Sequence, residues 1–188
     1  MRALWNPVPA FKTLIFGLYE AVQRFGCYYA VHLRRGDKLS THEMRHISAG
    51  MYYQSVMNTC RQQSAMCCTN LFVVYDDRKL YNEFHQMSAK KFRVFDLGKL
   101  LAMEKKSRYD YTIELNGMNV YDVLKDNQSQ WFIHTREVIV SITLLSLADH
   151  VFCTFSSNFC RVVALLRGNR CGFDTLHSLD TSWHKSLE

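Results

Sequence analysis

Apolar residues along this chain follow two patterns, helical spacing and short continuous runs. Between residues 11 and 25 they recur three and four positions apart, which predicts an amphipathic helix over 10–25 that Gly26 terminates. Further helices are predicted over 48–63, 78–88, 134–148 and 158–168. Short apolar runs that end in polar residues predict buried strands: CYYAVHLRR (27–35), TNLFVVYDD (69–77), FRVFD (92–96) and HVFCTFSS (150–157).

The alternation of strands and helices predicts an α/β fold, a Rossmann-like parallel sheet with helices on both faces. The stretch 98–131 has a weaker pattern, and we interpret it as an excursion over the surface. Two prolines and eight glycines leave little room for linkers, so residues 1–188 are predicted to form one domain.

Polar side chains gather at three of the predicted strand ends, which are His32–Lys38, Asp76–Asp77 and Thr154–Asn158. In open parallel sheets, ligands bind beyond the carboxyl ends of the strands, where the strand order reverses. We therefore expect these segments to line one ligand pocket. His32 lies within an apolar run, where a hydrogen-bonded core histidine is the ordinary interpretation.

The HLRRGDK segment has the composition of an anion site. Arg34 and Arg35 repel each other unless an anion or a carboxylate compensates their charge, and a guanidinium group matches the oxygens of phosphate. Asp37 can orient one arginine, and Lys38 can place a charge near a leaving phosphate. A cluster of surface ion pairs is the alternative interpretation.

The turn after the last predicted strand supplies neutral donors. Ser156 and Ser157 can donate hydroxyl groups where Asn158 begins a helix, and the free backbone N–H groups of that helix favour an anion. Simple capping of the helix by either serine is the alternative. Asp76 and Asp77 can orient arginines or bind a sugar hydroxyl, or cap the helix that begins near residue 78.

The charge of the chain agrees with an anionic ligand without identifying it. The net charge of +6 is dispersed rather than gathered in an arginine-rich arm, which disfavours a nucleic-acid-binding module. The seven cysteines show no CxxC pair and no Cys/His spacing typical of zinc, so no metal is expected. No apolar run reaches the length of a membrane span, and Asn127-Gln128-Ser129 is a glycosylation acceptor pattern.

The segments HLRRGDK, LFVVYDD and VFCTFSSNFCRV, followed by LHSLD, resemble the catalytic region of eukaryotic α-1,6-fucosyltransferases, glycosyltransferase family 23. The resemblance covers about residues 10–180, and VFCTFSSNFCRV is its most specific part. It implies a Golgi enzyme that transfers fucose from GDP-fucose, without a metal, to the innermost N-acetylglucosamine of N-glycans. The family's preceding domain and its C-terminal SH3-like domain are expected to be missing here, so a non-catalytic GDP-sugar-binding module is the alternative function.

The resemblance also implies a role for each residue at the strand ends. The residues expected around the donor pyrophosphate are Arg34, Arg35, Asp37, Lys38, Ser156, Ser157 and Asn158. His32 is expected at the guanine, and Asp76 and Asp77 match a pair of acids that the family needs for activity. Cys153 and Cys160 match a family disulfide that spans the phosphate-binding turn.

The catalytic base is the first of two positions where the chain departs from the family. The family has its base in a Thr-Glu pair, whereas this chain reads Thr41-His42-Glu43. Ungapped alignment places His42 at that position, but a one-residue insertion places Glu43 there and also aligns Tyr52 with a family tyrosine. We therefore favour Glu43 as the base that deprotonates the acceptor 6-hydroxyl.

The guanine contact is the second departure. Ser141 stands where the family has an aspartate that reads guanine, and losing such a contact costs about 1–3 kcal/mol. Selectivity for the base is therefore expected to differ from that of the family. Arg34 and Lys38 complete the predicted catalytic group together with Asp37, which can orient an arginine, because positive charge near the pyrophosphate stabilises the departing GDP.

Overall fold

A parallel sheet forms the centre of the protein. The computed structural model describes residues 9–24, 26–35, 46–63, 68–103, 128–168 and 173–181. In this part of the chain, five strands form one all-parallel sheet in the order β3-β2-β1-β4-β5. The strands are β1 (Tyr28–Leu33), β2 (Asn70–Tyr75), β3 (Arg93–Phe95), β4 (His150–Cys153) and β5 (Leu176–Ser178).

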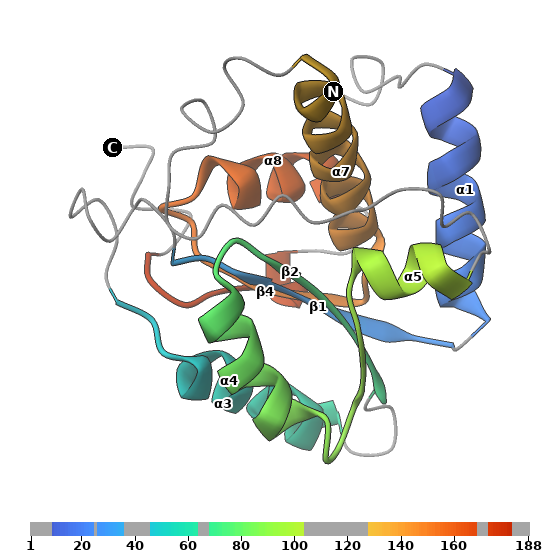
Figure 1. The fold of residues 1–188 in the computed structure, drawn as a ribbon. Coiled ribbons are helices and arrows are strands. Elements are labelled where there is room, and N and C mark those ends of the chain that lie inside the picture. Colours follow the sequence, from blue (N-terminus) through green and yellow to red (C-terminus); the bar gives the residue numbers. More distant parts are fainter. Residues whose placement is uncertain are drawn as a thin grey trace.

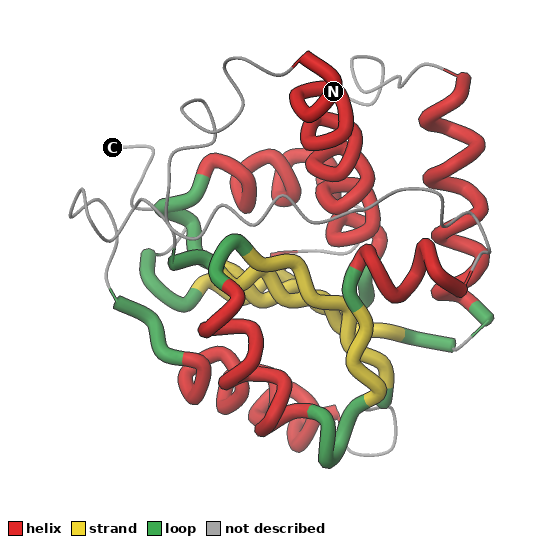
Figure 2. Tube along the Cα trace, in the orientation of Figure 1, coloured by secondary structure: helices red, strands yellow, loops and turns green. Residues whose placement is uncertain are grey.

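Helices cover both faces of this sheet, as Figures 1 and 2 show. One face carries α3 (Ala49–Gln63) and α4 (Arg78–Ser88), and the other carries α1 (Pro9–Gln23), α5 (Leu97–Met103), α7 (Gln128–Leu147) and α8 (Asn158–Arg167). Side chains of β1 alternate between the two faces: Tyr28 and Ala30 join one hydrophobic cluster, whereas Tyr29 and Val31 join the other. The predicted Rossmann-like fold is therefore confirmed.

The strand order reverses at β1, which lies in the middle of the sheet. After β1 the chain builds β2 and β3 on one side, then returns to add β4 and β5 on the other. Val31 of β1 pairs with Val73 of β2 and with Phe152 of β4. The carboxyl ends of these three strands therefore lie along one edge, with the reversal between β1 and β4.

The predicted boundaries agree closely with the structure over most of the chain. The first helix ends at Gln23, and Gly26 then adopts a positive φ of 85°, a conformation that glycine reaches without strain. Helix α7 begins at Gln128 rather than at 134, and only its first three residues, 128–130, form a polar stretch.

Helix α5 and strand β5 were not predicted. The segment interpreted as a surface excursion, 98–131, begins within α5, whose Leu100 and Leu101 are buried in the core, so that interpretation is wrong for 98–103. Seven residues are too few to display a helical period. The edge strand β5 was also missed, because its three half-buried residues form no apolar run.

Disulfide bonds connect neighbouring elements of the fold. The expected Cys153–Cys160 bond is present and joins the end of β4 to the first turn of α8, with Cα atoms 6.3 Å apart. A second bond, Cys27–Cys68, was not predicted and joins the segments before β1 and β2, with Cα atoms 5.4 Å apart. Cys60 is disulfide-bonded as well.

Candidate functional site

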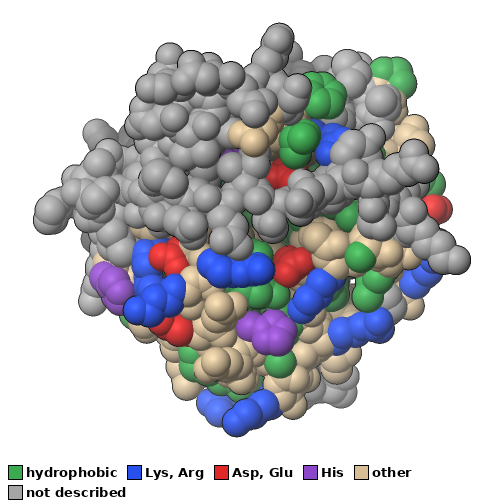
Figure 3. Space-filling model, in the orientation of Figure 1, with side chains coloured by type: hydrophobic (Ala, Val, Ile, Leu, Met, Phe, Trp, Pro, Cys, Tyr) green, Lys and Arg blue, Asp and Glu red, His purple; other side chains and the backbone are tan. Residues whose placement is uncertain are grey.

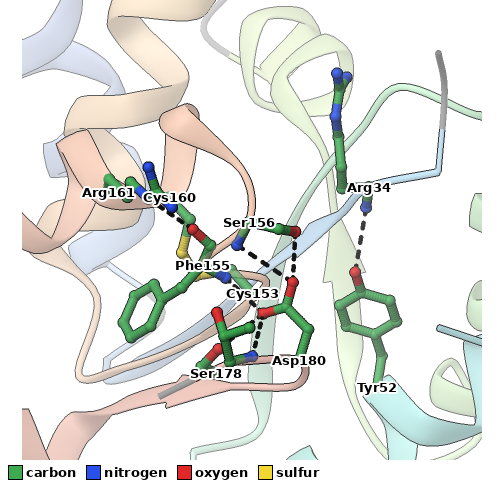
Figure 4. The surroundings of a disulfide bond; sticks show 10 residues. Arg34, Tyr52, Cys153, Phe155, Ser156, Cys160, Arg161, Ser178 and Asp180 are labelled. Atoms are coloured by element: carbon green, nitrogen blue, oxygen red, sulfur yellow. Dashed lines mark hydrogen bonds between the residues drawn. A yellow bond between two sulfur atoms is a disulfide. The ribbon is translucent and has the colours of Figure 1, made fainter. Parts of the chain in front are cut away.

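A buried tyrosine, Tyr52, bonds to the residue that follows β1, as Figure 4 shows. The backbone N–H of Arg34, which follows β1, donates to the hydroxyl of Tyr52 from α3 at 3.3 Å. The same hydroxyl lies near the side chain of Thr154, which follows β4, and burial raises the pKa of Tyr52. Tyr52, which the resemblance aligned with a family tyrosine, thus connects the two strand ends at the reversal point.

Carboxylates compensate the positive charges of Arg34 and Arg35 at the end of β1. Asp76 accepts a hydrogen bond from Nη1 of Arg34 and, at 2.9 Å, one from the backbone N–H of Arg35. Nη2 of Arg35 lies 3.9 Å from a carboxylate oxygen of Glu83 on α4. Ion pairs therefore form here, as one of the two interpretations predicted, and they also fix the direction in which Arg34 points.

The two aspartates after β2 have different partners. Asp76 orients arginines, whereas Asp77 is the N-cap of α4 and accepts from the backbone N–H of Leu80 at 2.8 Å. The capping role is therefore confirmed for Asp77, and the orienting role for Asp76.

The two serines after β4 also differ. The backbone N–H and the hydroxyl of Ser156 both donate to the carboxylate of Asp180, which lies just beyond β5. Ser157 occupies the N-cap position of α8, but its hydroxyl makes no capping bond, so simple capping by its side chain is wrong. Within the described ranges the Ser157 hydroxyl has no hydrogen-bond partner, although the residue is buried. Asn158 is exposed in the first turn of α8.

His32 is a buried, neutral histidine near the end of β1. Burial, with a smaller contribution from the charge of Arg34, lowers the pKa of His32 to about 3. Its ring stacks on Phe159 of α8 with centroids 4.3 Å apart. Its Nδ1 atom is buried without a hydrogen-bond partner in the described part of the chain. The expectation of a hydrogen-bonded core histidine is therefore not met at this nitrogen.

The predicted site residues that remain are Ser141, Asp37, Lys38 and Glu43, with His42 as the alternative base. Ser141 is buried in α7, which covers the same face of the sheet as Phe159. Asp37, Lys38, His42 and Glu43 lie outside the described residues.

An open cleft that was not predicted lies on the α4 side of the sheet. Figure 3 shows basic, acidic and histidine side chains on this face. The cleft is lined by Arg78, Tyr81, Asn82, His85, Gln86, Asp96 and Lys99. These groups bond to one another: the Tyr81 hydroxyl donates to Asp96 at 2.9 Å, and Nζ of Lys99 lies 3.5 Å from that hydroxyl.

One group of side chains has the spacing of metal ligands in the described ranges, namely Cys27, Cys68 and Asp149. The two sulfur atoms are bonded to each other, whereas a metal requires thiolates. Asp149 instead accepts from the backbone N–H of Tyr28 at 2.9 Å.

The candidate site is thus the edge between β1 and β4 in a Rossmann-like α/β protein. Neither a protein-family model nor a curated protein matches the chain. Asp180 is the residue of this site to which the sequence assigned no role, although the LHSLD segment that contains it carried part of the resemblance. Among the helices within the described ranges, none combines the length and apolarity needed to cross a bilayer.

Proposed function

We propose that the protein binds GDP-fucose at the edge between β1 and β4 and transfers fucose in α-1,6 linkage to the innermost N-acetylglucosamine of N-glycans. The observation that carries the proposal is that Arg34 follows β1 and the amino end of α8 follows β4, the two neighbouring strands between which the strand order reverses. Such reversal points are where parallel sheets bind ligands, and a helix amino end favours phosphate.

Unused polar atoms at this edge support a ligand. In the described part of the chain, Nδ1 of His32 is buried without a hydrogen-bond partner, and the hydroxyl of the buried residue Ser157 makes no hydrogen bond. Buried polar atoms are usually hydrogen-bonded, so a bound molecule that supplies partners would be stabilised here. Neutral His32 can exchange a hydrogen bond with a nucleobase, and Ser157 can donate to a phosphate oxygen.

In the proposed reaction the acceptor 6-hydroxyl oxygen bonds to the anomeric carbon of fucose as the bond from that carbon to the β-phosphate oxygen breaks. The hydroxyl proton passes to Glu43, the favoured base, or to His42. Arg34, oriented by Asp76, and the amino end of α8 are suited to stabilise the charge on departing GDP.

A binding module without transfer is the second candidate function. It is favoured by the ion pairs of Arg34 and Arg35, because Asp76 and Glu83 already compensate positive charge that would otherwise stabilise a leaving group. Disulfide bonds in the structure agree with a secretory compartment for either function, since they persist in oxidising environments.

Calorimetric titration of the protein with GDP and GDP-fucose tests the proposal. Ser157→Ala should weaken GDP binding about tenfold, the equivalent of one hydrogen bond to a charged group. Ser146→Ala is the matched control, because that hydroxyl bonds only within α7, to the Thr143 carbonyl at 2.8 Å.

Equal affinity of wild type and Ser157→Ala for GDP, or no binding by wild type, would reject the proposed site. Release of GDP from GDP-fucose in the presence of a core N-glycan acceptor then separates the two functions. Binding without release leaves the binding module as the function.

A further inference from the structure

The carboxylate of Asp180 is the most heavily bonded side chain at the candidate site. It accepts from the backbone N–H of Phe155 at 2.7 Å and from the backbone N–H of Ser156 at 3.2 Å. The Ser156 hydroxyl donates to the same carboxylate (Figure 4). The Ser178 hydroxyl at 3.0 Å and the backbone N–H of Thr181 at 2.7 Å also donate to it.

The position of Asp180 is itself fixed by the sheet. It follows the edge strand β5, and the backbone N–H of Leu179 donates to the carbonyl of Cys153 at 2.9 Å, extending the pairing of β4 and β5. Asp180 therefore reaches the 154–157 loop from beyond β4. The reversal point, with Arg34, lies on the other side of β4.

The loop has further restraints, which act on other atoms than those that bond to Asp180. The backbone N–H of Ser157 donates to the Thr154 carbonyl at 3.1 Å, and Cys153–Cys160 closes the turn. Nε of Arg161 donates to the carbonyl of Phe155 at 2.8 Å. The N–H groups of Phe155 and Ser156 bond to Asp180, so their directions depend on this carboxylate.

The electrostatics of Asp180 agree with this arrangement. Burial by itself would raise the pKa of Asp180, but the hydrogen bonds from Ser156, Thr181, Phe155 and Ser178 hold that pKa below its ordinary value. The carboxylate is therefore ionised at neutral pH, when charge-assisted hydrogen bonds to the loop are strongest.

We propose that Asp180 is the positioning residue of the anion site: it binds the Phe155–Ser156 segment so that the Ser157 hydroxyl and the first turn of α8 face the diphosphate. The inference rests on the proposed function and deepens it. In this arrangement the Ser156 hydroxyl bonds to Asp180 rather than to the ligand, and Ser157 is the serine that contacts phosphate.

The test compares Asp180→Asn with Asp174→Asn, a matched change at an exposed carboxylate in the 173–175 turn. Asp180→Asn should weaken GDP binding about tenfold, because charge-assisted hydrogen bonds are about twice as strong as neutral ones. In the ligand-free protein, the amides of Phe155 and Ser156 should exchange with deuterium about tenfold faster. Asp174→Asn should change neither quantity.

The pH dependence separates positioning from a general loss of structure. As the pH falls through the lowered pKa of Asp180, the wild-type carboxylate becomes neutral. The ratio of the GDP dissociation constants of Asp180→Asn and wild type should then fall toward one. If Asp180→Asn does not fold, Ser178→Ala removes a single bond to the carboxylate and should weaken GDP binding about threefold by the same reasoning.

Wild type that binds GDP, together with Asp180→Asn of equal or higher affinity, overturns the inference and leaves the proposed function intact. Wild type that does not bind GDP rejects the proposed function instead. The exchange rates of the Phe155 and Ser156 amides still decide in that case whether Asp180 holds the loop.

Discussion

The two edges of the sheet differ in how their polar side chains are used. At the amino edge these groups bond to one another: the amide of Gln63 donates to Nε2 of His150, whose Nδ1 lies 2.9 Å from Nε2 of His177. At the carboxyl edge, within the described ranges, Nδ1 of His32 is buried without a hydrogen-bond partner, and the hydroxyl of the buried residue Ser157 makes no hydrogen bond.

This difference separates residues that stabilise the fold from residues that are available to a ligand. A buried polar atom without a partner costs free energy, so a protein keeps such atoms where another molecule satisfies them or where strain serves a function. Substitutions in the amino-edge network should therefore change the free energy of unfolding, and substitutions of carboxyl-edge residues that lack partners or orient Arg34 should change ligand affinity.

Arg167 should give the largest effect on stability. This buried arginine at the end of α8 donates to the carbonyls of Ser146, Ala148 and Asp149 and to the Thr175 hydroxyl. Its replacement leaves several buried acceptors without donors, so Arg167→Met should lower the free energy of unfolding by about 3 kcal/mol.

Urea denaturation measures this change, with Arg61→Met on the exposed surface of α3 as the control. The affinity of the folded protein for GDP should stay the same. A loss of less than about 1 kcal/mol, comparable to an exposed ion pair, would remove the distinction between the edges.

The sequence predicted the carboxyl edge better than the amino edge. Strands β1 and β2 each contain six residues with a strong apolar run, so their ends and the polar residues beyond them could be located. The network of Gln63, His150 and His177 joins residues far apart in the chain. No local pattern indicates such pairings.

The chemistry of the site was predicted less completely than its position. Arg34, Asp76 and Ser157 were identified from their residue types at strand ends. The role of Asp180 could not be identified from the sequence, because its bonds to Phe155 and Ser156 exist only once β5 pairs with β4. Strand β5 is too short to predict. The pairing of Arg35 with Glu83 likewise depends on the packing of α4 against the sheet.

The histidine pair should make the amino edge sensitive to acid. Burial, then the neighbouring His150 and Arg167, lower the pKa of His177 to about 4, below the ordinary value of 6.5. Unfolded chains therefore take up a proton first as the pH falls below 6.5, and the free energy of unfolding decreases from there toward pH 4.

Between pH 7 and pH 5 this loss should reach about 1–2 kcal/mol, discounted for the partial exposure of the ring. His177→Gln should show a smaller loss over the same interval in urea denaturation. His46→Gln, at an exposed histidine, should behave like wild type. Identical pH dependence in His177→Gln and wild type would place the acid sensitivity elsewhere.

The neighbouring aspartates after β2 give the smallest and most direct test of the comparison, because they lie at the same strand end and differ only in their partners. Asp77 caps α4, so Asp77→Ala should lower the free energy of unfolding by about 1 kcal/mol and leave the affinity for GDP unchanged. Asp76 orients Arg34 and holds the backbone of Arg35, so Asp76→Asn should weaken GDP binding more than it destabilises the fold. Urea denaturation and calorimetry on both variants measure the two quantities. If Asp77→Ala weakens binding and Asp76→Asn changes only stability, Arg34 is a structural ion-pair partner and the carboxyl edge is no different from the amino edge.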